Sequence, residues 1–201
     1  MSTRSFATVI LVFVLTQLAA ASKDKPIKNT APLSNDEIAI YKAVLQHFVS
    51  GDSGPLNVSA TTYPLDPGSP MNPLSGGECL NGIRLENLAE VSHSFHDLTP
   101  DILPGKAMKL VDPNRQSKVV RGNDPSKTIR GGKSVDSAVR EAFATALFSM
   151  SEIAFDKEHR HAVVSYSFWC GSLCGNGSTL VLEKAGAEWK ATERNCGGWI
   201  S

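Results

Sequence analysis

The chain reads Phe168-Trp169-Cys170-Gly171-Ser172-Leu173-Cys174-Gly175-Asn176-Gly177 near its end, and this stretch decides the fold. β-prone runs enter and leave it, whereas its centre holds glycines and two cysteines. Glycine-rich segments between β-prone runs are typical of hairpin turns. The stretch therefore predicts a β-hairpin with a cysteine-bearing turn, which is a structural element of a sheet rather than a reaction centre.

Alternation of apolar and polar residues continues on both sides of this turn. It begins after Ser151 and returns in four segments, separated by short breaks at 156–161, 170–177 and 185–187. A period of two residues is that of a strand with one buried face. The apolar positions are Ile153, Phe155, Val164, Tyr166, Phe168, Leu180, Leu182, Trp189 and Ala191. This pattern predicts an antiparallel β-meander of about four strands.

Helices are predicted ahead of these strands. Ser34 and Glu37 have the spacing of a capping box, in which each side chain bonds the backbone N–H of the other residue. The apolar face that follows consists of Ile38, Tyr41, Leu45 and Phe48. A later helix is predicted over 135–148, where Asp136 and Arg140 have the spacing of an i, i+4 ion pair. Helices first and strands last indicate an α+β fold, with N-terminal helices packed on one face of a C-terminal sheet.

The segments between the first and last helices carry weaker signals. A strand is predicted over 57–63 and a loop over 64–78, where prolines and glycines cluster. A second helix is predicted over 85–97, and short strands over 109–112 and 118–121. The sequence shows no internal repeat.

Residues 1–21 have the features of an export signal. Arg4 precedes the apolar run Phe6–Leu15, and Ala19-Ala20-Ala21 offers small residues for cleavage after Ala21. The run is too short to span a bilayer, which takes about 20 residues. Residues 22–33 are predicted to be a disordered lead, and 34–201 a single domain. A secreted or periplasmic chain without a transmembrane span is expected.

Export makes the four cysteines candidates for disulfide bonds. Cys79, Cys170, Cys174 and Cys196 allow three pairings, which the sequence alone does not separate. The closeness of Cys170 and Cys174 favours a bond between them, which leaves Cys79 for Cys196. A redox motif is the alternative, but that chemistry places its first cysteine at the start of a helix. Here a turn and a strand are predicted instead.

The C-terminal part of the chain resembles a family of uncharacterised exported bacterial proteins. The resemblance is carried by Ser151-Glu152-Ile153-Ala154-Phe155-Asp156, by Cys170-Gly171-Ser172-Leu173-Cys174-Gly175-Asn176-Gly177, by Leu182-Glu183-Lys184, and by Trp189-Lys190 with Trp199-Ile200-Ser201. It covers about a quarter of the chain strongly. The resemblance implies a type of domain and no catalytic residues, and Cys79 and Cys196 lie outside the shared pattern.

His93, His96 and Asp97 are the candidate pocket residues. A histidine pair three residues apart on a helix can approach one ligand from the same face, with a carboxylate beside it. A closed zinc site takes about four ligands and an active one about three with water. The sequence offers no such set, no nucleophile motif and no phosphate loop, so no metal or cofactor is predicted.

The segment 106–133 is strongly basic, although the formal charge of the whole chain is zero. It holds eight Lys or Arg residues against two Asp. An anionic polymer is a possible partner, and a solvated loop balanced by acidic helices is the alternative. Nucleic acid is not expected, because the segment has no aromatic residue on which bases could stack.

Two functions are compatible with these patterns. The first is a non-catalytic exported module that binds a ligand or associates with the envelope. The alternative is a small exported hydrolase whose site is assembled from residues in 52–134. A deep pocket that joins His93, His96 and a carboxylate would favour the hydrolase.

Overall fold

A computed structural model of the chain describes residues 25–49, 55–67, 74, 79–194 and 196–201. The predicted export signal lies outside these ranges. Part of the predicted lead lies inside them, since Ile27–Asn29 form strand β1, which pairs in parallel with β3 (Ser94–His96). The Ile27 N–H also bonds the His93 carbonyl oxygen at 2.8 Å. The expectation of disorder over 22–33 therefore does not hold for β1.

One long hairpin organises the main sheet. Strands β7 (His161–Gly171) and β8 (Cys174–Ala185) pair antiparallel along nearly their whole length. Within the described residues the sheet has eight strands, in the order β10-β8-β7-β5-β2-β4, with β6 beside β7 and β9 beside β8. The other strands are β2 (Leu56–Ser59), β4 (Met108–Val111), β5 (Leu147–Met150), β6 (Ala154–Phe155), β9 (Glu188–Ala191) and β10 (Gly198–Ile200).

This sheet is larger and more mixed than the predicted four-stranded meander. β2 pairs in parallel with both β4 and β5, whereas β5 to β10 are joined by antiparallel pairs. Parallel strands need long crossover connections, and a helical segment connects β4 to β5, the two strands that lie on either side of β2. The fold is thus a mixture of helices and one large curled sheet, in keeping with the α+β class.

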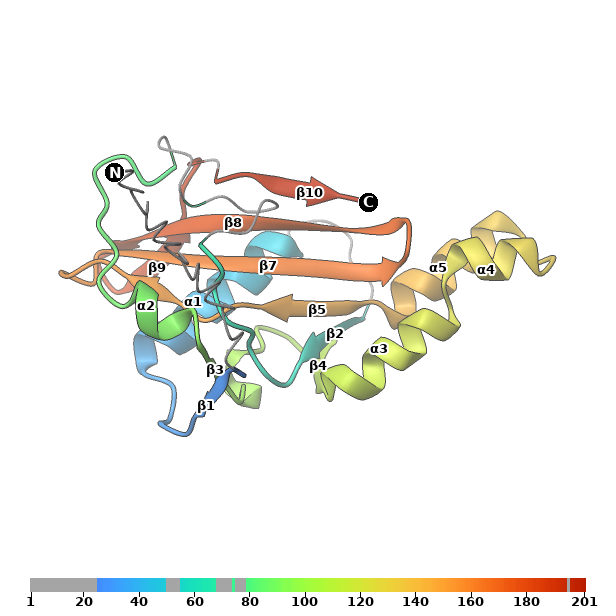
Figure 1. Cartoon of the computed structure of the whole chain (residues 1–201), viewed down its shortest axis with the longest axis horizontal. Helices are drawn as coiled ribbons and strands as arrows, with labels where there is room; N and C mark the ends of the chain where they lie inside the picture. Colours follow the sequence, from blue (N-terminus) through green and yellow to red (C-terminus); the bar gives the residue numbers. More distant parts are fainter. Residues whose placement is uncertain (1–24, 50–54, 68–73, 75–78, 195) are drawn as a thin grey trace, which may run out of the picture.

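Four of the helices occupy two places around the sheet. α1 (Asn35–Phe48) packs on one face, whereas α3, α4 and α5 gather at the end where the β7–β8 turn lies (Figure 1). α1 begins at the predicted capping box, with the Glu37 N–H donating to Ser34 Oγ at 3.2 Å and the Ser34 N–H donating to the Glu37 carboxylate at 2.7 Å. No helix among the described residues is long and apolar enough to cross a membrane. The other helices are α2 (Leu88–Val91), η1 (Pro100–Ile102), α3 (Pro113–Gly122), α4 (Pro125–Arg130) and α5 (Val135–Thr145).

Both faces of the sheet are buried around the long hairpin. Val164 and Leu182 belong to the larger core under α1, and their neighbours Val163 and Val181 belong to a smaller core on the opposite face. Successive side chains of a strand point to opposite faces, so these neighbours serve different cores. The smaller core also contains Cys79 and Cys196.

Four predicted elements differ from the structure. The strand predicted over 57–63 is β2, which ends at Ser59. The helix predicted over 85–97 is only the short α2, followed by a turn and β3. The strand predicted over 118–121 lies inside α3, because Asp112 caps a helix that begins at Pro113. The helix predicted over 135–148 ends at Thr145, and the chain then enters β5.

Candidate ligand-binding site

A disulfide crosses the turn of the β7–β8 hairpin. Cys170 and Cys174 are bonded, with their Cα atoms 5.0 Å apart. Gly171 between them has a φ of +148°, and a methyl group at this position would lie 2.7 Å from Cδ of Pro125. Both the backbone angle and the close approach require glycine. The turn is therefore packed directly against the start of α4.

A buried carboxylate fastens the turn to α4. Asp124 caps this helix by accepting the Ser126 N–H at 2.9 Å, and its other oxygen accepts the Ser172 N–H at 2.9 Å. Burial opposes ionisation of Asp124, but the hydrogen bonds from Ser172 and Ser126 outweigh it and hold the pKa of the carboxyl below its ordinary value. The position of the turn is thus fixed by a charged group as well as by the disulfide.

A pocket of about 640 Å³ opens beside this disulfide. We call it the hairpin pocket; α5, the end of α1 and the β7–β8 turn form its walls. The wall residues include Phe48, Phe143, Phe168, Leu173 and the bonded Cys170 and Cys174. Small-molecule sites have volumes of about 300–1,000 Å³ and mostly apolar walls. The hairpin pocket has both properties.

Three aromatic rings form one continuous wall of the hairpin pocket. The ring centre of Phe168 lies 5.4 Å from that of Phe48 and 5.5 Å from that of Phe143. Such separations are typical of tilted aromatic pairs that stabilise one another. Because Phe48 comes from α1, Phe143 from α5 and Phe168 from β7, the wall depends on the packing of three elements.

Three polar residues, Arg140, Asn176 and Ser201, interrupt the apolar lining. Asn176 Oδ1 is buried and has no hydrogen-bond partner within the described part of the chain. Arg140 of α5 also lines the pocket, and no carboxylate of the described residues pairs with it. The predicted Asp136–Arg140 ion pair is thus not formed. The lining therefore includes a buried acceptor from Asn176 and a cation from Arg140, with Ser201 as a further polar residue.

Large apolar side chains are exposed near the mouth of the hairpin pocket. The exposed fraction is 54% for Phe143, 75% for Leu173 and 91% for Ile200. Phe143 and Leu173 line the pocket, and Ile200 is the cross-strand partner of the lining residue Asn176. Clusters of exposed apolar residues are typical of binding sites. None of these residues was singled out by the sequence patterns as part of a site.

The structure does not bring the candidate residues His93, His96 and Asp97 together in one pocket. His93 is exposed in the turn before β3. Asp97 is exposed after β3 and pairs with Lys28 at 2.6 Å. His96, in contrast, is buried. The three residues lie in and beside a strand rather than on a helix, so the spacing on which their grouping relied does not apply.

His96 belongs instead to a buried hydrogen-bond network. Its Nδ1 lies 2.7 Å from Oε2 of Glu152, and its backbone N–H donates to Oε1 of the same carboxylate at 3.0 Å. The hydroxyl of Thr62 also donates to Glu152. Each polar group in this cluster satisfies another, which is what buried polar groups require. The network ties β3 to the segment between β5 and β6 and is structural.

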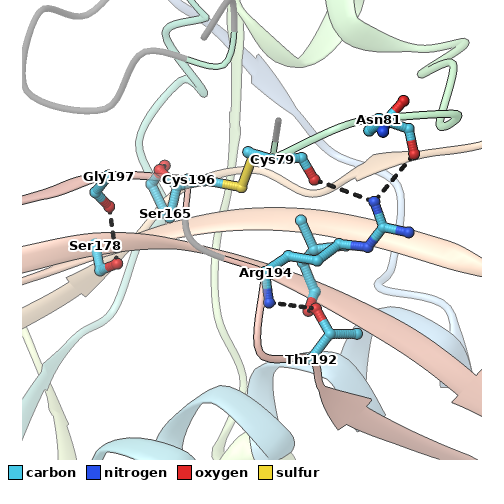
Figure 2. Close-up of a disulfide and its surroundings, with 10 residues drawn as sticks. Cys79, Asn81, Ser165, Ser178, Thr192, Arg194, Cys196 and Gly197 are labelled. Atoms are coloured by element: carbon cyan, nitrogen blue, oxygen red, sulfur yellow. Dashed lines mark hydrogen bonds between the residues drawn. A yellow bond between two sulfur atoms is a disulfide. The ribbon is translucent and has the colours of Figure 1, made fainter. Parts of the chain in front are cut away.

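The second disulfide fastens the C-terminal segment to the smaller core. Cys79 and Cys196 are bonded across a sequence separation of 117 residues, with Cα atoms 4.7 Å apart. Figure 2 shows Arg194 beside it, donating to the carbonyl oxygens of Cys79 at 3.4 Å and Asn81 at 3.1 Å. The two bonds are the pairs that the sequence favours. Neither cysteine of this second bond lines the hairpin pocket.

The basic segment 106–133 folds into β4, α3 and α4 rather than a loop. Of its eight basic residues, only Lys133 pairs with a carboxylate of the described chain, that of Glu141 at 2.5 Å. Its two aspartates cap helices: Asp112 accepts the Arg115 N–H at 2.7 Å, and Asp124 caps α4. Apart from Lys133, the basic residues of the segment form no ion pair with a carboxylate of the described residues.

Comparisons with known proteins add no evidence on the fold or the function of the chain. No family model matches the chain, and neither a curated protein nor a solved structure was found that matches it. The resemblance to exported bacterial proteins stays a prediction.

Proposed function

We propose that the chain is an exported, non-catalytic binding module that holds a small apolar or amphipathic molecule in the hairpin pocket. The observation that carries this proposal is the pocket itself, with its aromatic wall and the exposed apolar residues at its mouth. Transfer of apolar surface from water to such a wall is favourable. A ligand that covers Phe143 and Leu173 would remove both side chains from water.

Rigid walls support the same function. The Cys170–Cys174 bond limits the conformations of the turn, and Asp124 ties that turn to α4. A pocket that is already formed loses less conformational entropy when a ligand enters than one that must be ordered. From the sequence, this disulfide is predicted to be structural. In the proposed function it also holds one wall of the pocket in place.

The disulfides support the proposed location. Cysteine pairs form and persist mainly in oxidising compartments such as the periplasm and the extracellular space. Two bonded pairs agree with a secreted or periplasmic protein that works in or near the envelope.

Fluorescence of N-phenylnaphthylamine, a neutral apolar probe, tests the proposal. We expect the intact protein to bind the probe, and Ala144→Trp, which places an indole in the pocket, to weaken binding at least about tenfold, since the indole removes apolar contact area. Ala89→Trp is the matched control, because Ala89 is also exposed on a helix but lies on α2, outside the pocket. Equal probe binding by the two variants would contradict the proposal.

A further inference from the structure

We infer that the occupant of the hairpin pocket is an anionic amphiphile: an aliphatic chain joined to a headgroup that carries both an N–H or O–H donor and a negative charge. The inference rests on the proposed function and names the class of ligand. Three features of the pocket carry it: the buried acceptor of Asn176, the cation of Arg140, which pairs with no carboxylate of the described residues, and the apolar wall.

Asn176 selects a hydrogen-bond donor. It lies in a row of cross-strand partners, Phe148, Phe168, Asn176 and Ile200, that runs over one face of β5, β7, β8 and β10. Partners opposite each other across antiparallel strands share a face, so the amide has the apolar side chains of Phe168 and Ile200 on its two sides. A buried acceptor without a partner is unfavourable. A ligand that donates an N–H or O–H to Oδ1 removes this penalty, whereas a purely aliphatic ligand keeps it.

Arg140 selects an anion. Arg140 is exposed and lines the pocket, and no carboxylate of the described residues pairs with it. The planar guanidinium bonds carboxylate and phosphate groups through paired N–H donors. Neighbouring helices add to this preference, because the basic residues of α3 and α4 carry charge that the described carboxylates leave largely unpaired.

The apolar wall selects an aliphatic chain. Phe48, Phe143 and Phe168 offer ring faces on one side, and Leu173 extends the apolar surface out of the pocket. A chain can therefore lie along the wall with its far end over the exposed rim. Each methylene covered in this way should tighten binding about fourfold, until the chain passes the rim.

Two ligands that differ by one hydrogen-bond donor test the inference in the unmodified protein. N-dodecanoylglycine and N-dodecanoylsarcosine have the same chain and charge, but the second has a methyl group in place of the amide hydrogen. By calorimetry below micelle formation, we expect the glycine derivative to bind about threefold to tenfold more tightly. Dodecyltrimethylammonium, a cation with the same chain, should bind more weakly than both.

Variants of Asn176 and Arg140 test whether each residue is responsible for the ligand preference inferred for it. Asn176→Leu should reduce the preference for the glycine derivative to within about twofold, because the acceptor is gone. Arg140→Gln should weaken both anionic ligands about fivefold to tenfold. Arg115→Gln, which removes a similar exposed charge from α3 outside the pocket, should change them less than about twofold. Melting curves show whether each variant is folded. If Asn176→Leu is unstable, the comparison of the glycine and sarcosine derivatives in the parent protein still tests the inference.

A free amphiphile and a membrane lipid share this chemistry. A vesicle sedimentation experiment distinguishes the two sources. Sedimentation with phosphatidylglycerol vesicles that is lost in Ala144→Trp assigns the occupant to a membrane lipid. Binding of dodecanoylglycine without sedimentation assigns it to a free amphiphile.

Failure of the inference is distinguishable from failure of the proposed function. If N-phenylnaphthylamine binds in the pocket but the glycine and sarcosine derivatives bind equally, the pocket is a ligand site and the inferred headgroup is wrong. If the ammonium compound binds best, the inferred charge is wrong. If no probe responds to Ala144→Trp, both the inference and the proposed function fail.

Discussion

The indole of Trp199 packs directly on Gly177 of the neighbouring strand. Trp199 of β10 and Gly177 of β8 are cross-strand partners, and a methyl group at Gly177 would lie 2.9 Å from Cε2 of the indole and 2.7 Å from the Tyr166 carbonyl oxygen. Gly175 is covered by the same ring, since a methyl group there would lie 3.2 Å from Cζ3 of Trp199. The two glycines thus allow the terminal strand to approach the hairpin.

Gly177→Ala should destabilise the protein by about 1–3 kcal/mol, because the added methyl group overpacks the contact with Trp199. In a Trp199→Ala background the same change should cost less, but it should keep a residual cost from the Tyr166 carbonyl oxygen. Urea midpoints of the parent, the two single variants and the double variant measure the energetic coupling between Gly177 and Trp199. Gly105→Ala, where a methyl group meets nothing within 4 Å, is the control. Equal costs with and without Trp199 would show that the indole does not require the glycine.

Removal of either partner in the buried His96–Glu152 pair should be strongly destabilising. His96→Ala or Glu152→Ala should each cost about 3–5 kcal/mol, because each leaves a buried polar group without its partner. The double variant should lose less than the two single losses combined. His93→Ala is the matched control, since His93 is exposed three residues away, and it should leave the urea midpoint nearly unchanged. Additive losses would argue against a coupled pair.

Local signals predicted the elements that depend on neighbouring residues. The capping box at Ser34 and Glu37 and the cysteine-bearing hairpin turn are both present. The prediction of a helix over 85–97 was wrong because β3 forms by pairing with β1, which lies far away in the sequence. The helical nature of 113–130 was missed although a signal was available: Asp112-Pro113 and Asp124-Pro125 each place a capping residue before a proline, a typical start of a helix.

The glycine-rich stretch illustrates a limit of sequence patterns. The predicted break over 170–177 is in fact a turn of two residues, and Gly175 and Gly177 already lie in β8. Glycine within a strand can mark close approach of another group instead of a turn. That second reason applies here, and it depends on Trp199, which is more than twenty residues away.

The hairpin pocket could not be predicted from spacing because its walls come from separate elements. Phe48, Phe143 and Phe168 each fit a local pattern as core residues, and only the packing of α1, α5 and β7 leaves space between them. Arg140 was paired with Asp136 by helical spacing, but the structure forms no such pair. The sequence therefore supplied the members of the site without showing that they converge.

The two disulfides should contribute unequally to stability. In the chain-entropy account, the Cys79–Cys196 bond, with a separation of 117 residues, stabilises by about 5 kcal/mol, and the Cys170–Cys174 bond, with a separation of 4, by about 2 kcal/mol. Paired substitution of each bond by alanine, followed by urea denaturation, measures the difference. Loss of the shorter bond should also weaken probe binding, whereas the Cys79–Cys196 variant, if folded, should bind normally. The reverse order of stability losses would refute the entropic account.

Acid should destabilise the protein through three aspartates. A hydrogen bond from Lys184 lowers the pKa of Asp36. Burial opposes ionisation of Asp124 and Asp156, but their hydrogen bonds, which for Asp156 come chiefly from His161, also lower the pKa of each carboxyl. A carboxyl whose folded pKa lies below its unfolded value adds stability above the unfolded value, about 4, and loses it as the pH falls through the folded pKa. Unfolding midpoints should therefore fall steeply below about pH 4.

Asp124→Asn separates titration from the loss of a helix cap. The variant should be less stable than the parent at neutral pH, and the difference should shrink as the pH falls below about 4, because the parent carboxyl then becomes protonated as well. Ser134→Ala removes the cap of α5 without removing a titrating group, so its deficit should stay nearly constant over the same pH range. Thermal unfolding followed at pH steps from neutral to acid compares the two. A constant deficit for Asp124→Asn would mean that ionisation of Asp124 does not stabilise the hairpin turn.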